Sequence, residues 1–165
     1  YFGDIREETR PPLDVVGFLL SGGGSAIVEK PIDPSITLED LREFYRVLVT
    51  CGANIVEMNT VRKHLSAIKG GRLAQEIFPA MLINLTVSDV VGDPLDYITD
   101  PTVPDTSTVQ DAWRTLDKYD LWERLPARVR RHVYETSLRF ADEAWRRSGR
   151  RRPGPLLRRH PPMLP

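Results

Sequence analysis

The sequence predicts an α/β protein with a Rossmann-like, mostly parallel sheet flanked by helices. Two apolar runs of strand length, Val15–Leu20 and Met81–Val87, are each followed by a loop rich in Gly, Ser or Asp. Between and after these runs, apolar residues recur at helical spacing. Strands that alternate with helices are typical of this class.

The bulk composition fits one globular domain. A chain of 165 residues is long enough for a real core, and 41% hydrophobic with 28% charged residues is typical of soluble proteins. No apolar run reaches the length of a membrane span, so no membrane contact is expected. The single Cys51 excludes an intramolecular disulfide framework and favours a reducing, cytoplasmic location.

Charge is distributed unevenly along the chain. Seven of the 23 basic residues are Arg after Trp145, where no acid occurs, so residues 1–144 hold 16 basic against 23 acidic side chains. A basic tail marks either contact with nucleic acid or a membrane, or a disordered extension. The Pro content of residues 146–165 favours a disordered tail, and nucleic acid is not the expected partner.

A glycine-rich turn, Ser21-Gly22-Gly23-Gly24-Ser25-Ala26, follows the first strand. Glycine permits positive φ and close approach to the main chain. If a helix begins near Ser25, the loop amides would point outward as an anion site. The turn therefore binds phosphate or carboxylate, or it is a tight turn that binds nothing. It matches neither a Walker loop nor GxGxxG.

The first long helix is expected to begin after Thr37, an N-cap with an acid three residues later, and to stop at Gly52. Its expected buried face recurs at helical spacing: Leu38, Leu41, Tyr45, Leu48 and Val49. Residues 53–58 are then expected to form a short connection or a strand.

The next helix is expected to start at Asn59 or Thr60 and to bury one face. Its core positions have i, i+4, i+7 spacing: Val61, Leu65 and Ile68. Arg62 and Lys63 would then lie in the first turn, where the helix dipole disfavours cations. A bound anion would resolve that conflict, and ordinary solvated cations are the alternative. Lys69-Gly70-Gly71 adds a cation and permissive backbone.

Two carboxylates, Asp89 and Asp93, follow the second strand in a Gly/Pro-containing loop. In open α/β sheets, ligands gather at the carboxyl ends of strands. The pair could hold Mg²⁺ through water or orient a hydroxyl, but spacing alone favours ordinary turn chemistry. Further on, Ser107 with Gln110 is expected to cap a helix, and a last helix is expected near Pro126. Its expected inward positions are Val129, Val133, Leu138 and Trp145.

Four motifs occur together in the order Ser21–Ala26, Asn59–Gly71, Ser88–Asp93 and Pro101–Asp105. With them, the chain from Val15 to Val133 resembles the glycerate 2-kinase family. Members of that family have an N-terminal domain followed by a smaller C-terminal domain called MOFRL, and some are named hydroxypyruvate reductases.

The resemblance implies transfer of the ATP γ-phosphate, with Mg²⁺, to the 2-hydroxyl of D-glycerate. Phosphoryl transfer depends mostly on positioning and charge stabilisation. Arg62, Lys63 and Asp89 are then the catalytic candidates, and Asp89 and Asp93 the metal candidates. The candidates for phosphate or substrate binding are Ser21, Gly22, Gly23, Gly24, Ser25, Asn59, Lys69, Gly70 and Gly71.

Departures from the family pattern predict that this chain alone is inactive or barely active. Residues 1–145 correspond to part of the N-terminal domain, and the MOFRL domain is absent. An upstream catalytic lysine and an arginine of the second domain have no counterpart. Thr99-Asp100-Pro101-Thr102 replaces the usual Ser-Gly-Pro-Thr, and the added carboxylate would repel ATP or glycerate.

Two other functions stay open at this point. A hydroxypyruvate reductase-type oxidoreductase would need nicotinamide binding, yet the chain has no GxGxxG. A non-catalytic module that binds nucleic acid or other anions through the basic tail is the other alternative.

Overall fold

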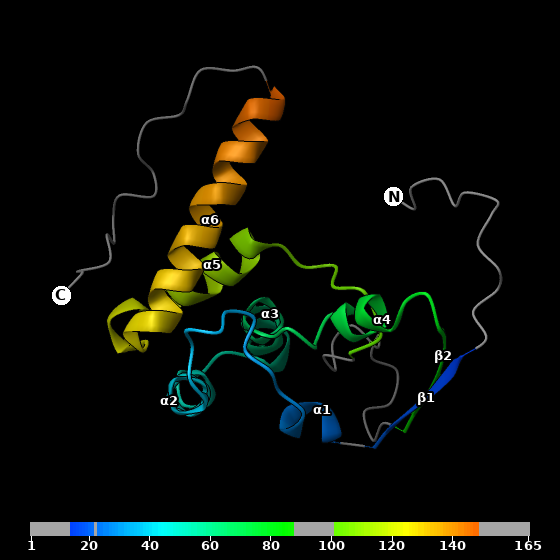
Figure 1. Ribbon diagram of the computed structural model, residues 1–165. Coiled ribbons are helices and arrows are strands. Elements are labelled where there is room, and N and C mark those ends of the chain that lie inside the picture. Colours follow the sequence, from blue (N-terminus) through cyan, green and yellow to red (C-terminus); the bar gives the residue numbers. More distant parts are fainter. Residues whose placement is uncertain (1–13, 22, 88–100, 149–165) are drawn as a thin grey trace.

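The computed structural model describes residues 14–21, 23–87 and 101–148, and it confirms the α/β class (Figure 1). In chain order the elements are β1 (Val15–Leu20), α1 (Gly24–Ile27), α2 (Leu38–Val49), α3 (Ile55–Leu65), α4 (Arg72–Ile77), β2 (Met81–Thr86), α5 (Val109–Lys118), the 3₁₀ turn η1 (Trp122–Arg124) and α6 (Ala127–Ser148). Figure 1 shows the strand pair at one end of the molecule, the larger helices at the other, and α4 between them.

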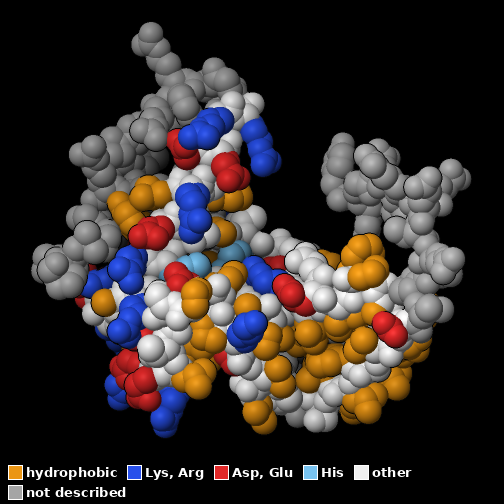
Figure 2. Space-filling model, viewed as in Figure 1, with side chains coloured by type: hydrophobic (Ala, Val, Ile, Leu, Met, Phe, Trp, Pro, Cys, Tyr) orange, Lys and Arg blue, Asp and Glu red, His pale blue; other side chains and the backbone are white. Residues whose placement is uncertain are grey.

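The sheet of the described residues is a parallel pair, with β1 beside β2 in register from Val15 opposite Met81 to Leu20 opposite Thr86. Both strands were predicted, and parallel pairing follows from the helical connection between them. Alternate side chains of one face are exposed, with Leu19 opposite Leu85. Apolar side chains gather over this end of the molecule in Figure 2.

The hydrophobic core lies among α2, α3, α5, η1 and α6. Its buried apolar residues include Phe44, Val61, Leu116, Trp122 and Val129. Thr37 caps α2 in a capping box with Asp40, as predicted. The predicted burial of Leu38 and Val49 is wrong, because these first and last residues of α2 lie beyond its packed section.

Helix α3 begins earlier than predicted and also ends earlier. Asn54 is its N-cap and forms a capping box with Glu57, so residues 53–58 are not a strand. Arg62 and Lys63 consequently lie in the last turn, where the helix dipole favours cations. The dipole argument for a bound anion is therefore wrong.

The helix ends at Leu65 because the Ser66 hydroxyl accepts from the amides of Ile68 and Lys69, both at 3.1 Å. Ile68 lies outside the helix as a result. Where the sequence predicted one continuous helical face, the structure has a helix followed by a turn.

The last two helices also differ in detail from the prediction. Thr108, and not Ser107, caps α5 with Asp111, because Ser107 donates from its amide and its hydroxyl to Asp105. Helix α6 begins after Pro126 and buries Val129 and Val133, whereas Leu138 is exposed.

Helix α6 runs through Ser148, so residues 146–148 of the predicted tail are helical, and the rest of that tail lies outside the described residues. Within the described ranges, none of the helices combines the length and the apolar character needed to cross a bilayer.

Candidate functional site

The glycine-rich turn connects β1 to α1. Ser21 directly follows β1, and its carbonyl accepts a hydrogen bond from the amide of Gly24 at 2.9 Å. Gly23, at φ +78°, precedes α1, which begins within one residue of the predicted start. Ser25 is half-buried in α1, and Gly22 lies outside the described residues. The turn has the predicted place at the carboxyl end of a strand.

Arg62 lies in the last turn of α3 and stacks over an aromatic ring of α2. Its guanidinium carbon is 5.1 Å from the centre of the Tyr45 ring. Its NH1 donates to the side-chain oxygen of Asn59 at 2.9 Å. Its Nε is enclosed and has no hydrogen-bond partner among the described residues. Buried N–H groups normally have an acceptor, so this unpaired donor needs an explanation.

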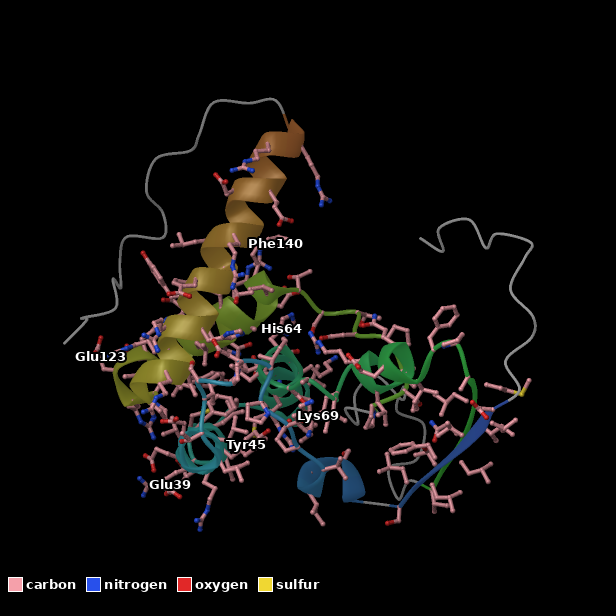
Figure 3. All side chains as sticks on the ribbon, in the orientation of Figure 1. Glu39, Tyr45, His64, Lys69, Glu123 and Phe140 are labelled. Carbon is pink, nitrogen blue, oxygen red and sulfur yellow. The ribbon has the colours of Figure 1, made fainter. Side chains whose placement is uncertain are left out.

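Lys69 lies in the turn after α3 and its side chain is fully buried. Its ammonium donates to the carbonyl of Val28 at 2.6 Å and to Glu29 Oε2 at 2.8 Å. The Tyr45 hydroxyl donates to the same Glu29 oxygen. Figure 3 shows Lys69 between α3 and α1. Because Val28 and Glu29 directly follow α1, Lys69 links the turn after α3 to the segment that follows α1.

Burial changes the ionisation of Lys69 and Tyr45. It lowers the pKa of the Lys69 ammonium, and the hydrogen bond to Glu29 opposes that change. Burial, and then the negative charge of Glu29, raise the pKa of the Tyr45 hydroxyl well above its usual range. Tyr45 is therefore a hydrogen-bond donor at neutral pH.

Lys63 lies in the last turn of α3 and pairs with Asp105. Its ammonium lies 2.7 Å from Asp105 Oδ1, and both side chains are nearly enclosed. His64 Nδ1 lies 2.8 Å from the Thr60 carbonyl, which can only accept, so Nδ1 carries the proton. Arg72 donates from NH1 to the carbonyls of Lys63 and Lys69, at 2.7 and 2.9 Å.

Gly70 and Gly71 have positive φ angles of 66° and 79°. A Cβ on Gly70 would lie 3.0 Å from the Asp105 Cβ, and one on Gly71 would lie 3.0 Å from the Pro104 backbone. These glycines therefore let residues 103–105 pack against the turn after α3. That is a structural use of the two residues, beside their predicted role in phosphate binding.

The remaining predicted residues concern metal binding. Asp89 and Asp93 lie outside the described residues. Within the described parts of the chain, no group of three or more His, Cys, Asp or Glu could hold a metal ion.

Sequence reasoning missed Glu29 and Tyr45, and it quoted Asp105 in a motif without giving it a role. Glu29 lies 40 residues from Lys69, and no local pattern marks it as a partner. Together with these residues, the turn after α3 gathers four cations around two described carboxylates: Arg62, Lys63, Lys69 and Arg72, with Glu29 and Asp105. The described cluster therefore carries excess positive charge, which attracts anions.

The fold and this cluster define an α/β domain with a cationic turn beside a glycine-rich loop. A family described as a domain of unknown function, DUF4147, matches residues 6–134. The chain belongs to this family.

Named relatives are similar to the same part of the chain. The glycerate 2-kinase of Pyrococcus horikoshii is 50% identical over 121 residues, which are 73% of this chain and 27% of that protein. The D-glycerate 2-kinase of Thermotoga maritima is 50% identical over 109 residues, 66% of this chain and 26% of that protein.

A solved structure, that of the PH0495 protein from Pyrococcus horikoshii OT3, superposes with a TM-score of 0.70 at 47% identity. The superposition covers 80% of this chain and 30% of the solved one. This chain spans about a quarter of the length of the curated relatives it matches.

Proposed function

We propose that this chain is the part of a glycerate 2-kinase that forms one wall of the phosphate and substrate site. The reaction is transfer of the ATP γ-phosphate to the 2-hydroxyl of D-glycerate, which gives 2-phosphoglycerate. The observation that carries the proposal is the 50% identity to two relatives named glycerate 2-kinase. The excess positive charge around the turn after α3 supports it, because ATP and glycerate are both anions.

The proposed roles follow the chemistry of each group. Amides of the Ser21–Ser25 turn approach phosphate oxygens, and Arg62 supplies a planar donor pair for a phosphate or the glycerate carboxylate. Gly70 and Gly71 keep the neighbouring turn compact. Lys63 and Asn59 lie on the same helix as Arg62, where Lys63 supplies a second cation and Asn59 a neutral amide.

Mg²⁺ is the cofactor that we propose together with ATP. Asp89 and Asp93 are its proposed ligands, because carboxylate oxygens are the ligands that Mg²⁺ prefers in proteins. When bound, the ion would neutralise charge on the phosphate oxygens. A cytoplasmic location also belongs to the proposal.

Catalysis is proposed to need groups from the parts of the relatives that these 165 residues do not match, since the match covers about a quarter of their length. The purified 165-residue chain is therefore expected to form little or no 2-phosphoglycerate from ATP and D-glycerate. Formation at a rate typical of a kinase would contradict that part of the proposal.

A chimeric enzyme tests whether the residues of this chain are competent. The matching segment of the Thermotoga maritima D-glycerate 2-kinase is replaced by residues 15–133 of this chain, and ATP-dependent 2-phosphoglycerate formation is measured. We expect an active chimera, and a further gain when Asp100 is changed to Gly. A folded chimera without activity, with or without that change, would count against the proposal.

A further inference from the structure

Glu29 is the meeting point of three segments that lie far apart in the sequence. Its Oε2 accepts from Lys69 Nζ at 2.8 Å and from the Tyr45 hydroxyl of α2. Its Oε1 accepts from the amide of Lys30 at 3.0 Å. The Glu29 side chain is 9% exposed and the Lys69 side chain 0% exposed. The carboxylate therefore holds the segment after α1 against both α2 and the turn after α3.

Backbone hydrogen bonds continue the same attachment. The Lys69 ammonium donates to the Val28 carbonyl, and the amide of Ala67 donates to the Lys30 carbonyl at 2.8 Å. The amide of Ile32 donates to the Leu65 carbonyl at 3.0 Å. Residues 28–32 thus run beside residues 65–69, a few residues beyond the glycine-rich turn. These contacts attach the segment that follows α1 to the turn after α3.

The Lys69 ammonium is poorly placed to bind a ligand directly. It already donates to two acceptors at short distance, the Val28 carbonyl and Glu29 Oε2. To reach an anion it must leave Glu29, and a buried carboxylate without its partner is strongly unfavourable. Arg62 differs, because its enclosed Nε has no acceptor among the described residues.

We propose that the charged residues of the site have two different roles. Lys69 and Glu29 are positioning residues that fix the glycine-rich turn against the end of α3, and Arg62 is the cation that contacts the bound anion. The anion is a phosphate group of ATP or the carboxylate of glycerate, so the inference rests on the proposed function.

Side-chain NMR of the full 165-residue chain separates contact from positioning. The Lys69 Nζ and Arg62 Nε signals are followed during titration with ATP and, separately, with D-glycerate. We expect the Arg62 Nε signal to shift and the Lys69 Nζ signal to stay in place. A Lys69 shift that saturates together with ligand binding would overturn the assignment, as would an unchanged Arg62 signal when backbone amides report binding.

A matched pair of variants tests the positioning role without any ligand. Lys118 forms the same kind of group, since it donates to Glu57 at 2.6 Å and the Tyr119 hydroxyl donates to Glu57 at 2.8 Å. Lys118 is largely exposed, and its partners lie on α3 and at the end of α5. Lys69→Met and Lys118→Met therefore remove equivalent charges, one inside the proposed site and one outside it.

We expect Lys69→Met to accelerate hydrogen exchange of the amides of Ala26, Val28 and Ile32 at least about tenfold, because it breaks a buried ion pair beside them. Lys118→Met should leave those amides unchanged. Glu29→Gln, which keeps the size of the side chain, should act in the same direction as Lys69→Met and serves if that variant does not fold.

A folded Lys69→Met or Glu29→Gln variant with unchanged exchange would overturn the positioning role. Lys69→Arg, which keeps the charge, should restore most of the protection, whereas a simple volume effect would not be relieved by the longer side chain. If neither ATP nor glycerate shifts any signal of the wild-type chain, the proposed function fails for this chain and Arg62 loses its assignment. The exchange measurement still decides the positioning role in that case.

Discussion

The Lys63 ammonium lies 2.7 Å from Asp105 Oδ1, and the two side chains are only 4% and 11% exposed. Lys63 belongs to α3, and Asp105 to the loop before α5. The same carboxylate oxygen accepts from the amide and the hydroxyl of Ser107. This buried pair fixes the loop to the helix that carries three of the predicted site residues.

Asp105→Asn should strongly destabilise the protein. It removes the negative charge that lies 2.7 Å from the buried Lys63 ammonium, and breaking such a pair typically costs about 3–5 kcal/mol of unfolding free energy. Urea denaturation of both proteins measures the loss. Glu43→Gln removes an exposed partner of Arg46 and is the control, which should leave stability nearly unchanged. Equal, small effects of the two variants would show that the Lys63–Asp105 pair is not buried in solution.

Gly71→Ala should destabilise the chain more than Gly52→Ala. Both glycines have positive φ, 79° and 87°, so an alanine at either position carries a backbone penalty of about 1–2 kcal/mol. Only at Gly71 would the added Cβ meet backbone, 3.0 Å from Pro104, whereas Gly52 has open space around it. Thermal unfolding of the two variants gives the comparison. Similar losses of stability in the two variants would mean that residues 103–105 shift away from the added Cβ without any loss of stability.

Local signals predicted the strands and the first capping box, and they failed where two similar signals compete. Asn54 and Asn59 are both good N-caps, but Glu57, three residues after Asn54, completes a capping box only for the first. At the start of α5, Ser107 with Gln110 and Thr108 with Asp111 both fit the capping pattern, and the structure uses Thr108. In both helices the observed cap is the candidate with an acid three residues later.

Contacts between distant segments were beyond such reasoning. The Lys69–Glu29 pair joins residues 40 apart, and its existence depends on how α1 and the turn after α3 pack together. A lysine and a glutamate in separate loops carry no signal of that pairing. Lys69 contacts Val28 and Glu29, which directly follow α1, and the sequence reasoning gave neither of these two residues a role.

The corrected start of α3 has a measurable consequence. Asn54→Ala removes the side-chain oxygen that accepts from the amide of Glu57 at 2.9 Å, and loss of such a cap costs about 1 kcal/mol. Urea denaturation should show this loss. Asn54→Ser keeps a capping oxygen and should retain most of the stability. An Asn54→Ala variant as stable as the wild type would contradict the cap at Asn54 and favour a helix start at Asn59 or Thr60.

His64 should make stability fall at mildly acidic pH. Burial lowers the pKa of its imidazole below the ordinary value of 6.5, although the Thr60 carbonyl and Asp105 oppose the change. As the pH falls below 6.5, the unfolded chain takes up the proton first, so the free energy of unfolding decreases until the folded-state pKa is passed. His64→Gln has no imidazole that takes up a proton at this position, so its free energy of unfolding should fall less than that of the wild type between about pH 7.5 and 5.5. An NMR titration that gives His64 a pKa above 6.5 would contradict the sign.

Substitutions on the exposed sheet face should change how the chain associates. Leu19 and Leu85 lie opposite each other on β1 and β2, and they are 76% and 61% exposed. Neither strand contains a charged residue, and uncharged strands with an apolar face favour association between chains. Figure 2 shows that charged side chains gather instead over the helical end of the molecule.

Leu19→Lys places a charge on that face and should lower the fraction of associated chain at a given concentration, measured by sedimentation velocity. Leu38→Lys is the control, because Leu38 is also exposed but lies at the first turn of α2, away from the strands. It changes the net charge equally and should leave association as in the wild type. If both variants reduce association to the same extent, net charge rather than the sheet face is responsible. If neither does, the sheet face does not drive association.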